Sequence, residues 1–312
     1  MSGAYCSLQE LVGLRFLAQD LPLFRHTKSR ALMSGGARSP FKGRGVDFEE
    51  VRAYQFGDDI RTIDWRVTAR RMKPHTKVFN EERERPVMVL LDQSHSMFFG
   101  SRLNFKSVTA AETAALISWA TLQHGDRIGG VIFNEDSLTE IRPKRSNKSL
   151  MHLFSQTEKM NNALNINNMP GTLPQGFLAK ALRHARRVAH PGTHIFIISD
   201  FSNMNDEASR NLQQLAKHCQ LMALHITDPM EQELPIPGRY SITNGHHRHT
   251  IDTRQKDVRE QFRQQHQNRN QHLSNLLIQY RIPLLQLSTH QSTSDQLLDL
   301  FGASRHRKQR DT

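Results

Sequence analysis

Two runs of the chain are apolar at every position, and each leads into an aspartate. Residues 87–91 are followed by Asp92, and residues 195–198 are followed by Ser199 and Asp200. Apolar runs without alternation are typical of parallel strands that are covered on both faces of a sheet. In open α/β sheets, ligands bind in the crevice at the carboxyl ends of such strands. We therefore expect Asp92 and Asp200 to lie at one edge of a mainly parallel sheet.

Helical periodicity and further apolar runs alternate along the rest of the chain. Strands that alternate with helices favour right-handed crossovers and a sheet with helices on both faces. Helices are predicted over 104–124, 147–160, 177–190, 206–218, 254–281 and 294–301, and strands over 126–133, 137–142, 221–226 and 283–287. The strand at 137–142 is expected at an antiparallel edge, and the helix at 104–124 is expected to pack through one face, made by Val108, Ala111, Ala115, Trp119 and Leu122.

The part of the chain before the first apolar run is organised differently. Residues 7–21 have apolar side chains at helical spacing, with a capping-box pattern at Ser7 and Glu10, which predicts a helix that docks on the body or on a partner. Residues 34–45 are rich in glycine and basic residues and are expected to form a linker. Residues 46–85 mix acids, arginines and aromatics, which predicts a small subdomain held partly by ion pairs. Three of its acids, Asp58, Asp59 and Asp64, are expected to form ion pairs with Arg52, Arg61 and Arg66. The alternative is that these acids are catalytic.

Composition and charge are compatible with several classes of ligand and do not distinguish among them. The 312 residues carry a net charge of +12 and have a pI of about 10.1, which allows affinity for nucleic acid, anionic lipid or an acidic protein surface. A solvated basic surface is the plainer interpretation. No apolar run approaches the ~20 residues that span a bilayer, and no signal-peptide pattern is present, so we expect no transmembrane segment. The two distant cysteines, Cys6 and Cys219, favour a cytoplasmic location.

Three stretches place hard oxygen ligands at the expected edge of the sheet. They are Asp92-x-Ser94-x-Ser96, Gly171-Thr172 and Asp200. Two carboxylates and three hydroxyls suit Mg²⁺ or Mn²⁺, and an ion held mainly by hydroxyls attracts a further carboxylate from a partner. The alternative is an ordinary strand-to-helix turn with serine caps. A weaker candidate for a transition metal is the loop with His246, His247 and His249.

The three stretches together resemble the metal-ion-dependent adhesion site of von Willebrand factor A domains. Residue by residue, Asp92, Ser94 and Ser96 match its first motif, Thr172 its second and Asp200 its third. His95 departs from the pattern, since small residues are common at that position. It is expected to face solvent, with a role in capping the metal or in tuning access to it with pH as the alternative. The upstream block over 45–70 and 81–86 is similar to the bacterial domain-of-unknown-function-58 family.

These resemblances imply a fold, a domain organisation and a function. The fold is a von Willebrand factor A-like, doubly wound sheet over 86–303, preceded by a small N-terminal subdomain within 1–85 and followed by a disordered basic tail at 304–312. The function is a non-enzymatic, metal-dependent protein-binding module that receives an Asp or Glu of its partner. The implied partner is a MoxR-type AAA+ ATPase, for which the protein acts as an adaptor or chaperone-like component.

Two other functions remain open at this point. One is nucleic-acid binding through the basic helices at 177–190 and 254–281, which a steep loss of affinity with salt would support. The other is a metal-dependent phosphoesterase with Asp92 as nucleophile or ligand. The Asp-x-Ser-x-Ser spacing lacks the second aspartate and the general base that such chemistry calls for.

Overall fold

The computed structural model describes residues 3–23, 46–55, 58–81, 84–166, 174–243 and 248–302. The chain divides into two compact units, one of Met1–Lys28 together with Arg85–Thr312 and one of Ser29–Glu84. The helical segment near the N-terminus thus groups with the α/β unit. The small unit contains the charged block that precedes the first apolar run.

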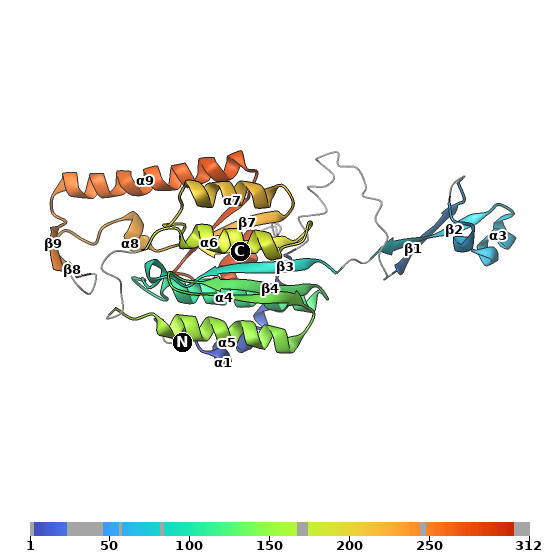
Figure 1. The fold of residues 1–312 in the computed structure, drawn as a ribbon, viewed down its shortest axis with the longest axis horizontal. Helices are drawn as coiled ribbons and strands as arrows, with labels where there is room; N and C mark the ends of the chain where they lie inside the picture. The colour runs from blue at the N-terminus through green and yellow to red at the C-terminus, as the bar shows by residue number, and fades with distance from the viewer. Residues whose placement is uncertain are drawn as a thin grey trace, which may run out of the picture. The chain divides into compact units, whose positions relative to one another are not determined.

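A six-stranded sheet with the order β10-β7-β6-β3-β4-β5 forms the centre of the larger unit (Figure 1). Its neighbouring strands pair in parallel, except for the edge strand β5, which pairs antiparallel with β4. The predicted doubly wound, mainly parallel sheet of the von Willebrand factor A type is therefore confirmed, with its antiparallel edge. The strands are β3 (Pro86–Asp92), β4 (Arg127–Phe133), β5 (Leu138–Lys144), β6 (His194–Ser199), β7 (Gln220–Thr227) and β10 (Leu284–Ser288).

The strand order places a switch point between β3 and β6. From β3 the chain continues through β4 and β5 on one side, and then crosses to β6, β7 and β10 on the other. Successive crossovers leave the sheet in opposite directions at such a point, which opens a crevice outside the carboxyl ends of the two strands. Asp92 and Asp200 lie at these two strand ends.

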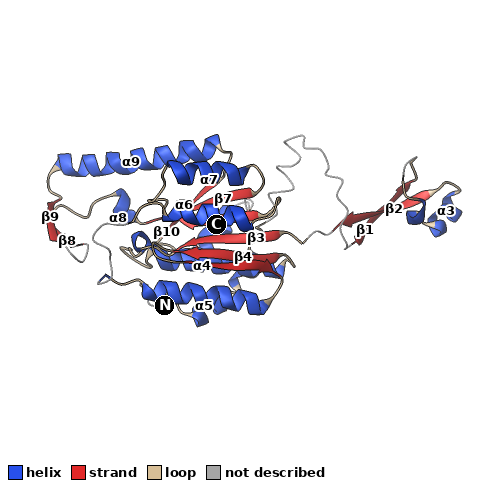
Figure 2. Cartoon of the chain, viewed as in Figure 1, coloured by secondary structure: helices blue, strands red, loops and turns tan. Residues whose placement is uncertain are grey.

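Helices cover both faces of the sheet (Figure 2). Alternate residues of β3 enter two cores: Val87, Val89 and Leu91 pack with α4 and α5, whereas Met88 and Leu90 pack with α6, α7 and α9. This explains why residues 87–91 of β3 are all apolar. The helices are α4 (Lys106–Gln123), α5 (Asn147–Ala163), α6 (Phe177–Val188), α7 (Asp206–Ala216), α9 (Lys256–Gln279) and α10 (Thr293–Phe301).

Helix α4 is buried on nearly all sides, whereas its sequence predicted that it packs through one face only. Every residue from Lys106 to Thr121 is buried. Between the apolar positions, the hydroxyls of Thr113, Ser118 and Thr121 donate to main-chain carbonyls four residues earlier. These bonds satisfy the hydroxyls within the helix, and a face that reads as polar can therefore be buried.

The N-terminal segment was predicted to dock either on the body of the protein or on a partner, and it docks on α4 and α5 of the body. It is broken into α1 (Leu8–Gly13) and a 3₁₀ turn, η1 (Leu17–Asp20), and α1 begins with the predicted capping box between Ser7 and Glu10. Leu11 is fully buried, and its carbonyl accepts a hydrogen bond from Trp119 Nε1 of α4 at 3.1 Å.

The small unit is an antiparallel pair of strands with two short helical segments. These are β1 (Val46–Ala53), β2 (His75–Glu81), η2 (Ile60–Thr62) and α3 (Trp65–Arg71). The expected ion pair between Asp58 and Arg52 is present at 2.7 Å. Asp59 and Asp64 accept hydrogen bonds from the backbone amides of Arg61 and Arg66, so these acids cap η2 and α3.

The excursion after β7 contains the short helix α8 (Pro229–Gln232) and the antiparallel strands β8 (Arg239–Thr243) and β9 (Arg248–Asp252). Within the ranges that the structure describes, no helix has the length and apolarity to cross a membrane. Three sequence-based predictions lie wholly or partly outside those ranges: the linker at 34–45, the loop with His246 and His247, and the tail at 304–312.

Candidate metal centre

Asp92 ends β3 and is held by a hydrogen bond on each carboxylate oxygen. Oδ1 accepts from the amide of Ser94 at 2.9 Å, and Oδ2 accepts from the hydroxyl of Ser199, the last residue of β6, at 2.6 Å. The residue is only 1% exposed. Burial raises the pKa of Asp92 to about 7, the negative charge of Asp200 adds to the rise, and the hydrogen bonds from Ser199 and Ser94 oppose it.

Three serine hydroxyls form a chain beside Asp92 and Asp200. Ser94 Oγ lies 3.1 Å from Ser96 Oγ, and Ser202 Oγ donates to Ser96 Oγ at 3.0 Å. The chain runs from buried Ser94 to exposed Ser202, so its outer end is open to solvent. Ligand oxygens about 2.1 Å from Mg²⁺, in neighbouring octahedral positions, lie about 3.0 Å apart. The spacing of these hydroxyls therefore fits the coordination of Mg²⁺ or Mn²⁺.

Hydroxyls are essential to any metal site at this edge. In the described part of the chain, no three His, Cys, Asp or Glu side chains gather in a way that could hold a metal ion. A divalent ion here would have Ser94, Ser96 and Ser202 as hydroxyl donors and Asp92 and Asp200 as the nearby negative charges. This is a hard-oxygen set without nitrogen or sulfur, which disfavours copper or nickel.

Asp200 follows β6 and is paired with a buried ammonium group. Lys106 Nζ donates to Asp200 Oδ2 at 2.7 Å, and the amide of Ser202 donates to Asp200 Oδ1 at 2.9 Å. Burial on its own would raise the pKa of Asp200, but the Lys106 ammonium holds it at about 2. Asp200 is therefore a carboxylate whose charge is largely balanced by Lys106, in contrast to Asp92.

Lys106 also connects Asp200 to helix α8. Its ammonium donates to Glu231 Oε1 at 2.6 Å, and Lys106 itself is only 2% exposed. Glu231 belongs to a capping box in which Asp228 accepts from the amide of Met230 and donates its own amide to Glu231 Oε2. Asp228 Oδ2 in turn accepts from the amide of Ser101 at 2.8 Å. The start of α4, the end of β6 and α8 are thus joined by charged groups.

His95 is buried, which corrects the expectation that it faces solvent. Its amide donates to Glu135 Oε1 at 2.8 Å, and its ring Nδ1 lies 3.3 Å from Glu135 Oε2. Glu135 comes from the turn between β4 and β5 and is itself buried. The imidazole therefore anchors the loop that carries Ser94 and Ser96 to the neighbouring turn.

Thr172, the predicted ligand from the second motif, lies outside the described residues, as does Gly171. The chain is described again from Pro174, where Asn203 holds it beside the end of β6. Asn203 Nδ2 donates to the carbonyl of Pro174 at 3.3 Å, and its Oδ1 accepts from the amide of Gly176 at 2.8 Å.

The structure brings together Asp92, Ser94, Ser96 and Asp200, and adds residues that the sequence-based set omitted. Ser199 and Ser202 flank Asp200, and the pattern Asp200-x-Ser202 repeats the start of Asp92-x-Ser94-x-Ser96, which is a signal that could have been used. Lys106 and Glu231 carry no such signal, because a lysine in a predicted helix and a glutamate outside the predicted strands and helices are both expected on the surface.

Comparison with known proteins identifies the family. The model of the family described as "Protein of unknown function DUF58" matches residues 50–272. The chain belongs to the DUF58 family. Curated relatives include the uncharacterized proteins Rv1480 of Mycobacterium tuberculosis and Mb1516 of Mycobacterium bovis. Each is 30% identical to this DUF58 protein over 226 residues, which cover 70% of this chain and 67% of the relative.

Solved structures are similar to the DUF58 protein at low sequence identity. The conserved hypothetical protein BatB from Bacteroides thetaiotaomicron is 18% identical, with a TM-score of 0.40 over 68% of this chain and 93% of its own. An aerotolerance-related membrane protein from Bacteroides fragilis is 15% identical, with a TM-score of 0.42 over 69% and 96%. The SpRpn10 VWA domain is 10% identical, with a TM-score of 0.38 over 70% and 95%.

Proposed function

We propose that this DUF58 protein is a non-enzymatic protein-binding module whose partner contact depends on a divalent metal ion. The observation that carries the proposal is the chain of hydroxyls of Ser94, Ser96 and Ser202 beside Asp92 and Asp200, at the spacing of octahedral ligands. The hydroxyls hold the ion without neutralising it. A bound ion would supply Lewis acidity to which an oxygen of the partner could bind.

The charge balance of the site favours a carboxylate as the partner group. Lys106 already balances Asp200 at 2.7 Å, so the site offers a divalent ion less negative charge than two free aspartates would. The remaining positive charge attracts an Asp or Glu side chain. Thr172, from the second motif, is proposed as a further hydroxyl donor.

The proposed partner is a MoxR-type AAA+ ATPase in the cytoplasm. The support is the family: DUF58 proteins resemble components encoded beside such ATPases and are thought to act as adaptors or chaperone-like partners. Cys6 and Cys219 are free, buried thiols, which suits a reducing compartment, and burial raises the pKa of Cys6 to about 12.

The geometry disfavours the phosphoesterase alternative. Both carboxylate oxygens of Asp92 accept hydrogen bonds from Ser94 and Ser199, which does not suit a nucleophile. The nearest imidazole along the loop, His95, has its Nδ1 beside Glu135, and its Nε2 is buried without a hydrogen-bond partner, so neither ring nitrogen is open to a water molecule that attacks a substrate.

The test compares wild type with Ser96→Ala, which removes a central hydroxyl, and with Ser155→Ala on α5 as the matched control. Thermal melting is measured in EDTA and with Mg²⁺ or Mn²⁺. For wild type and Ser155→Ala we expect a rise of about 3–5 °C at ten times the Kd, because an ion that binds only the folded state stabilises it. Ser96→Ala should melt like wild type in EDTA and lose most of the rise.

The same three proteins, immobilised, are then exposed to a native lysate with Mg²⁺ or EDTA. An AAA+ ATPase retained only with Mg²⁺, by wild type and Ser155→Ala but not by Ser96→Ala, supports the proposal. Retention that EDTA leaves intact contradicts a metal-bridged contact. A metal response that is equal in wild type and Ser96→Ala contradicts the site itself.

A further inference from the structure

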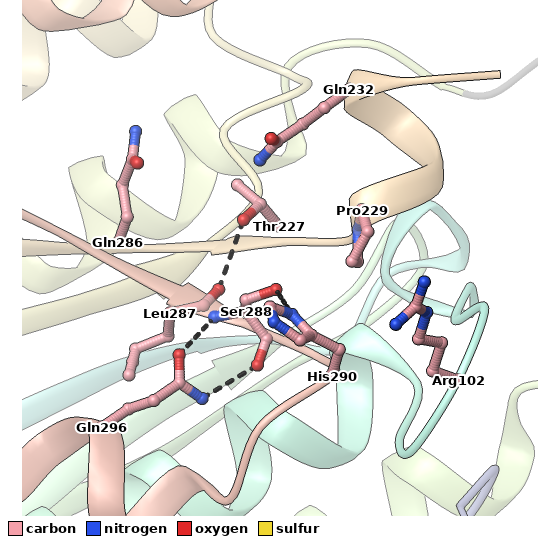
Figure 3. A pocket seen from close by; sticks show the side chains of 9 residues that line it. All are labelled: Arg102, Thr227, Pro229, Gln232, Gln286, Leu287, Ser288, His290 and Gln296. Carbon is pink, nitrogen blue, oxygen red and sulfur yellow. Dashed lines mark hydrogen bonds between the residues drawn. The ribbon is translucent and has the colours of Figure 1, made fainter.

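A cavity of ≈ 430 Å³ lies at the carboxyl ends of β7 and β10, next to α8 (Figure 3). Thr227 ends β7, Pro229 and Gln232 belong to α8, and Ser288 ends β10. None of the residues of the candidate metal centre lines it. Its lining consists of Arg102, Thr227, Pro229, Gln232, Gln286, Leu287, Ser288, His290 and Gln296.

One wall of the cavity is fixed by internal hydrogen bonds. Gln296 of α10 accepts from the amide of Ser288 at 2.7 Å and donates to its carbonyl at 2.9 Å, as a neighbouring strand would. Ser288 Oγ lies 2.6 Å from His290 Nδ1, and Thr227 Oγ1 donates to the carbonyl of Leu287 at 3.5 Å. This wall is polar but already paired, and is therefore rigid.

The remaining polar side chains of the lining are free to bind a ligand. Arg102, Gln232 and Gln286 are exposed, and among the described residues their side chains have no hydrogen-bond or ion-pair partner. Arg102 carries the one permanent charge of the lining, which contains no Asp or Glu. The cavity is thus complementary to an anion.

The chemistry of the free groups distinguishes among anions. A guanidinium group matches one carboxylate, with two parallel hydrogen bonds. Glutamine amides both donate and accept, and so does a peptide group, whereas a phosphate at neutral pH mainly accepts. Two free glutamines and one arginine, spread around the same cavity, therefore fit a carboxylate that is attached to a peptide chain better than they fit a small inorganic anion.

The edge of the sheet offers main-chain groups at the same place. β10 pairs with β7 on one side only, and the bonds to β7 involve the carbonyl of Pro283 and the amide of Thr289. Since alternate residues of a strand direct their main chain to opposite sides, the amide and carbonyl of Gln286 face the open side, as those of Ser288 do towards Gln296. An extended peptide can add to such an edge.

We propose that this cavity binds an extended peptide segment through a Glu or Asp side chain, with Arg102 as the carboxylate contact and Gln232 and Gln286 as contacts to peptide groups. The assignment does not require the metal centre. Ser101, next to Arg102, is bonded to Asp228 at the start of α8, so the cavity and the metal centre are attached to one hydrogen-bonded network.

The experiment is an NMR titration of the ¹⁵N-labelled full chain in EDTA, which keeps its outcome separate from that of the metal proposal. The probe is the blocked tetrapeptide acetyl-Ala-Val-Thr-Glu-amide, and its matched control has Gln in place of Glu. We expect saturable shifts of the Arg102 Nε–H signal and of the side-chain amides of Gln232 and Gln286. Affinity for the Gln peptide should be at least about tenfold lower.

The Arg102→Gln variant should bind the Glu peptide about tenfold more weakly than wild type does. Arg187 is an exposed arginine on α6, and the Arg187→Gln variant should bind the Glu peptide like wild type. Inorganic phosphate should not displace the Glu peptide at equal concentration. Equal binding of the two peptides, unchanged binding by Arg102→Gln, displacement by phosphate, or the absence of saturable shifts at millimolar peptide would each overturn the proposal.

Discussion

Lys106 is a charged side chain in the interior, at the first position of the most buried helix of the molecule's described part. Its ammonium lies between Asp200 at 2.7 Å and Glu231 at 2.6 Å. Burial alone would lower the pKa of Lys106, but the two carboxylates raise it above its ordinary value, so the group is charged. A buried cation next to a proposed cation site competes with the metal ion for the charge of Asp200.

Lys106→Met should therefore strengthen metal binding while it weakens the metal-free fold. Removal of the ammonium leaves the negative charge of Asp200 available to a divalent ion, and we expect the Kd for Mn²⁺ to fall by about tenfold or more. Without metal, two carboxylates lose their counter-charge, which costs about 3–5 kcal/mol of unfolding free energy. Isothermal titration with Mn²⁺ and melting in EDTA measure the two effects.

Lys106→Arg keeps the charge, and Lys180→Met removes an exposed lysine of α6; both serve as controls and should bind Mn²⁺ within a few-fold of wild type. If Lys106→Met folds in the presence of Mn²⁺ and binds it no more tightly than Lys106→Arg does, the ammonium does not compete with the ion.

At the scale of elements, the pattern of apolar and polar residues predicted most strands and helices, because each face of these elements is either buried or exposed along its whole length. β3 and β6 are buried on both faces, and their inner residues, 87–91 and 195–198, are all apolar. Because the two strands are parallel neighbours, Asp92 and Asp200 lie at the same edge of the sheet. Pattern was less informative for α4, since the hydroxyls of Thr113, Ser118 and Thr121 are satisfied by carbonyls of their own helix and leave no trace in the periodicity. Contacts such as that of Lys106 with α8 depend on tertiary packing and cannot be inferred from spacing.

The first residue of β6, His194, makes this strand sensitive to acid. Burial and the nearby positive charge of Arg85 lower the pKa of His194 to about 4. A folded-state pKa below the unfolded value of about 6.5 means that the unfolded chain binds the proton more readily, so stability is present above pH 6.5 and is lost as pH falls towards 4. At pH 5 the loss from this one group is about 2 kcal/mol.

His194→Gln should remove that part of the pH dependence. The measurement is the free energy of unfolding by urea at pH 7.5 and pH 5, in wild type and in the variant, since the difference between the two pH values is independent of any constant cost of the substitution. His152→Gln, on α5, is the control and should retain the wild-type difference. An equal loss in wild type and His194→Gln would show that this imidazole titrates normally in the fold.

At the scale of the whole molecule, the 42 Lys and Arg residues outnumber the 30 Asp and Glu residues, so ion pairs within the chain leave the net charge of +12 unbalanced. On α6, Arg183 pairs with Glu207 at 3.2 Å, and Arg263 of α9 lies 3.3 Å from Glu260. Such exposed pairs contribute little to stability and compete weakly with other anions. The basic surface therefore predicts attraction to polyanions in general.

The protein should accordingly bind duplex DNA weakly. This binding should depend on salt and not on the metal ion, which distinguishes it from the proposed metal-dependent binding of a protein. Affinity measured by fluorescence anisotropy should fall by at least about tenfold between roughly 50 and 200 mM salt, because binding releases counterions from the phosphates. Replacing Mg²⁺ by EDTA at constant ionic strength, or Ser96 by Ala, should leave the affinity unchanged, since neither alters the basic side chains. Binding that persists in high salt would contradict a contact made mainly with the phosphates. Binding that requires both the metal and Ser96 would make nucleic acid, in place of a protein partner, the ligand of the metal centre.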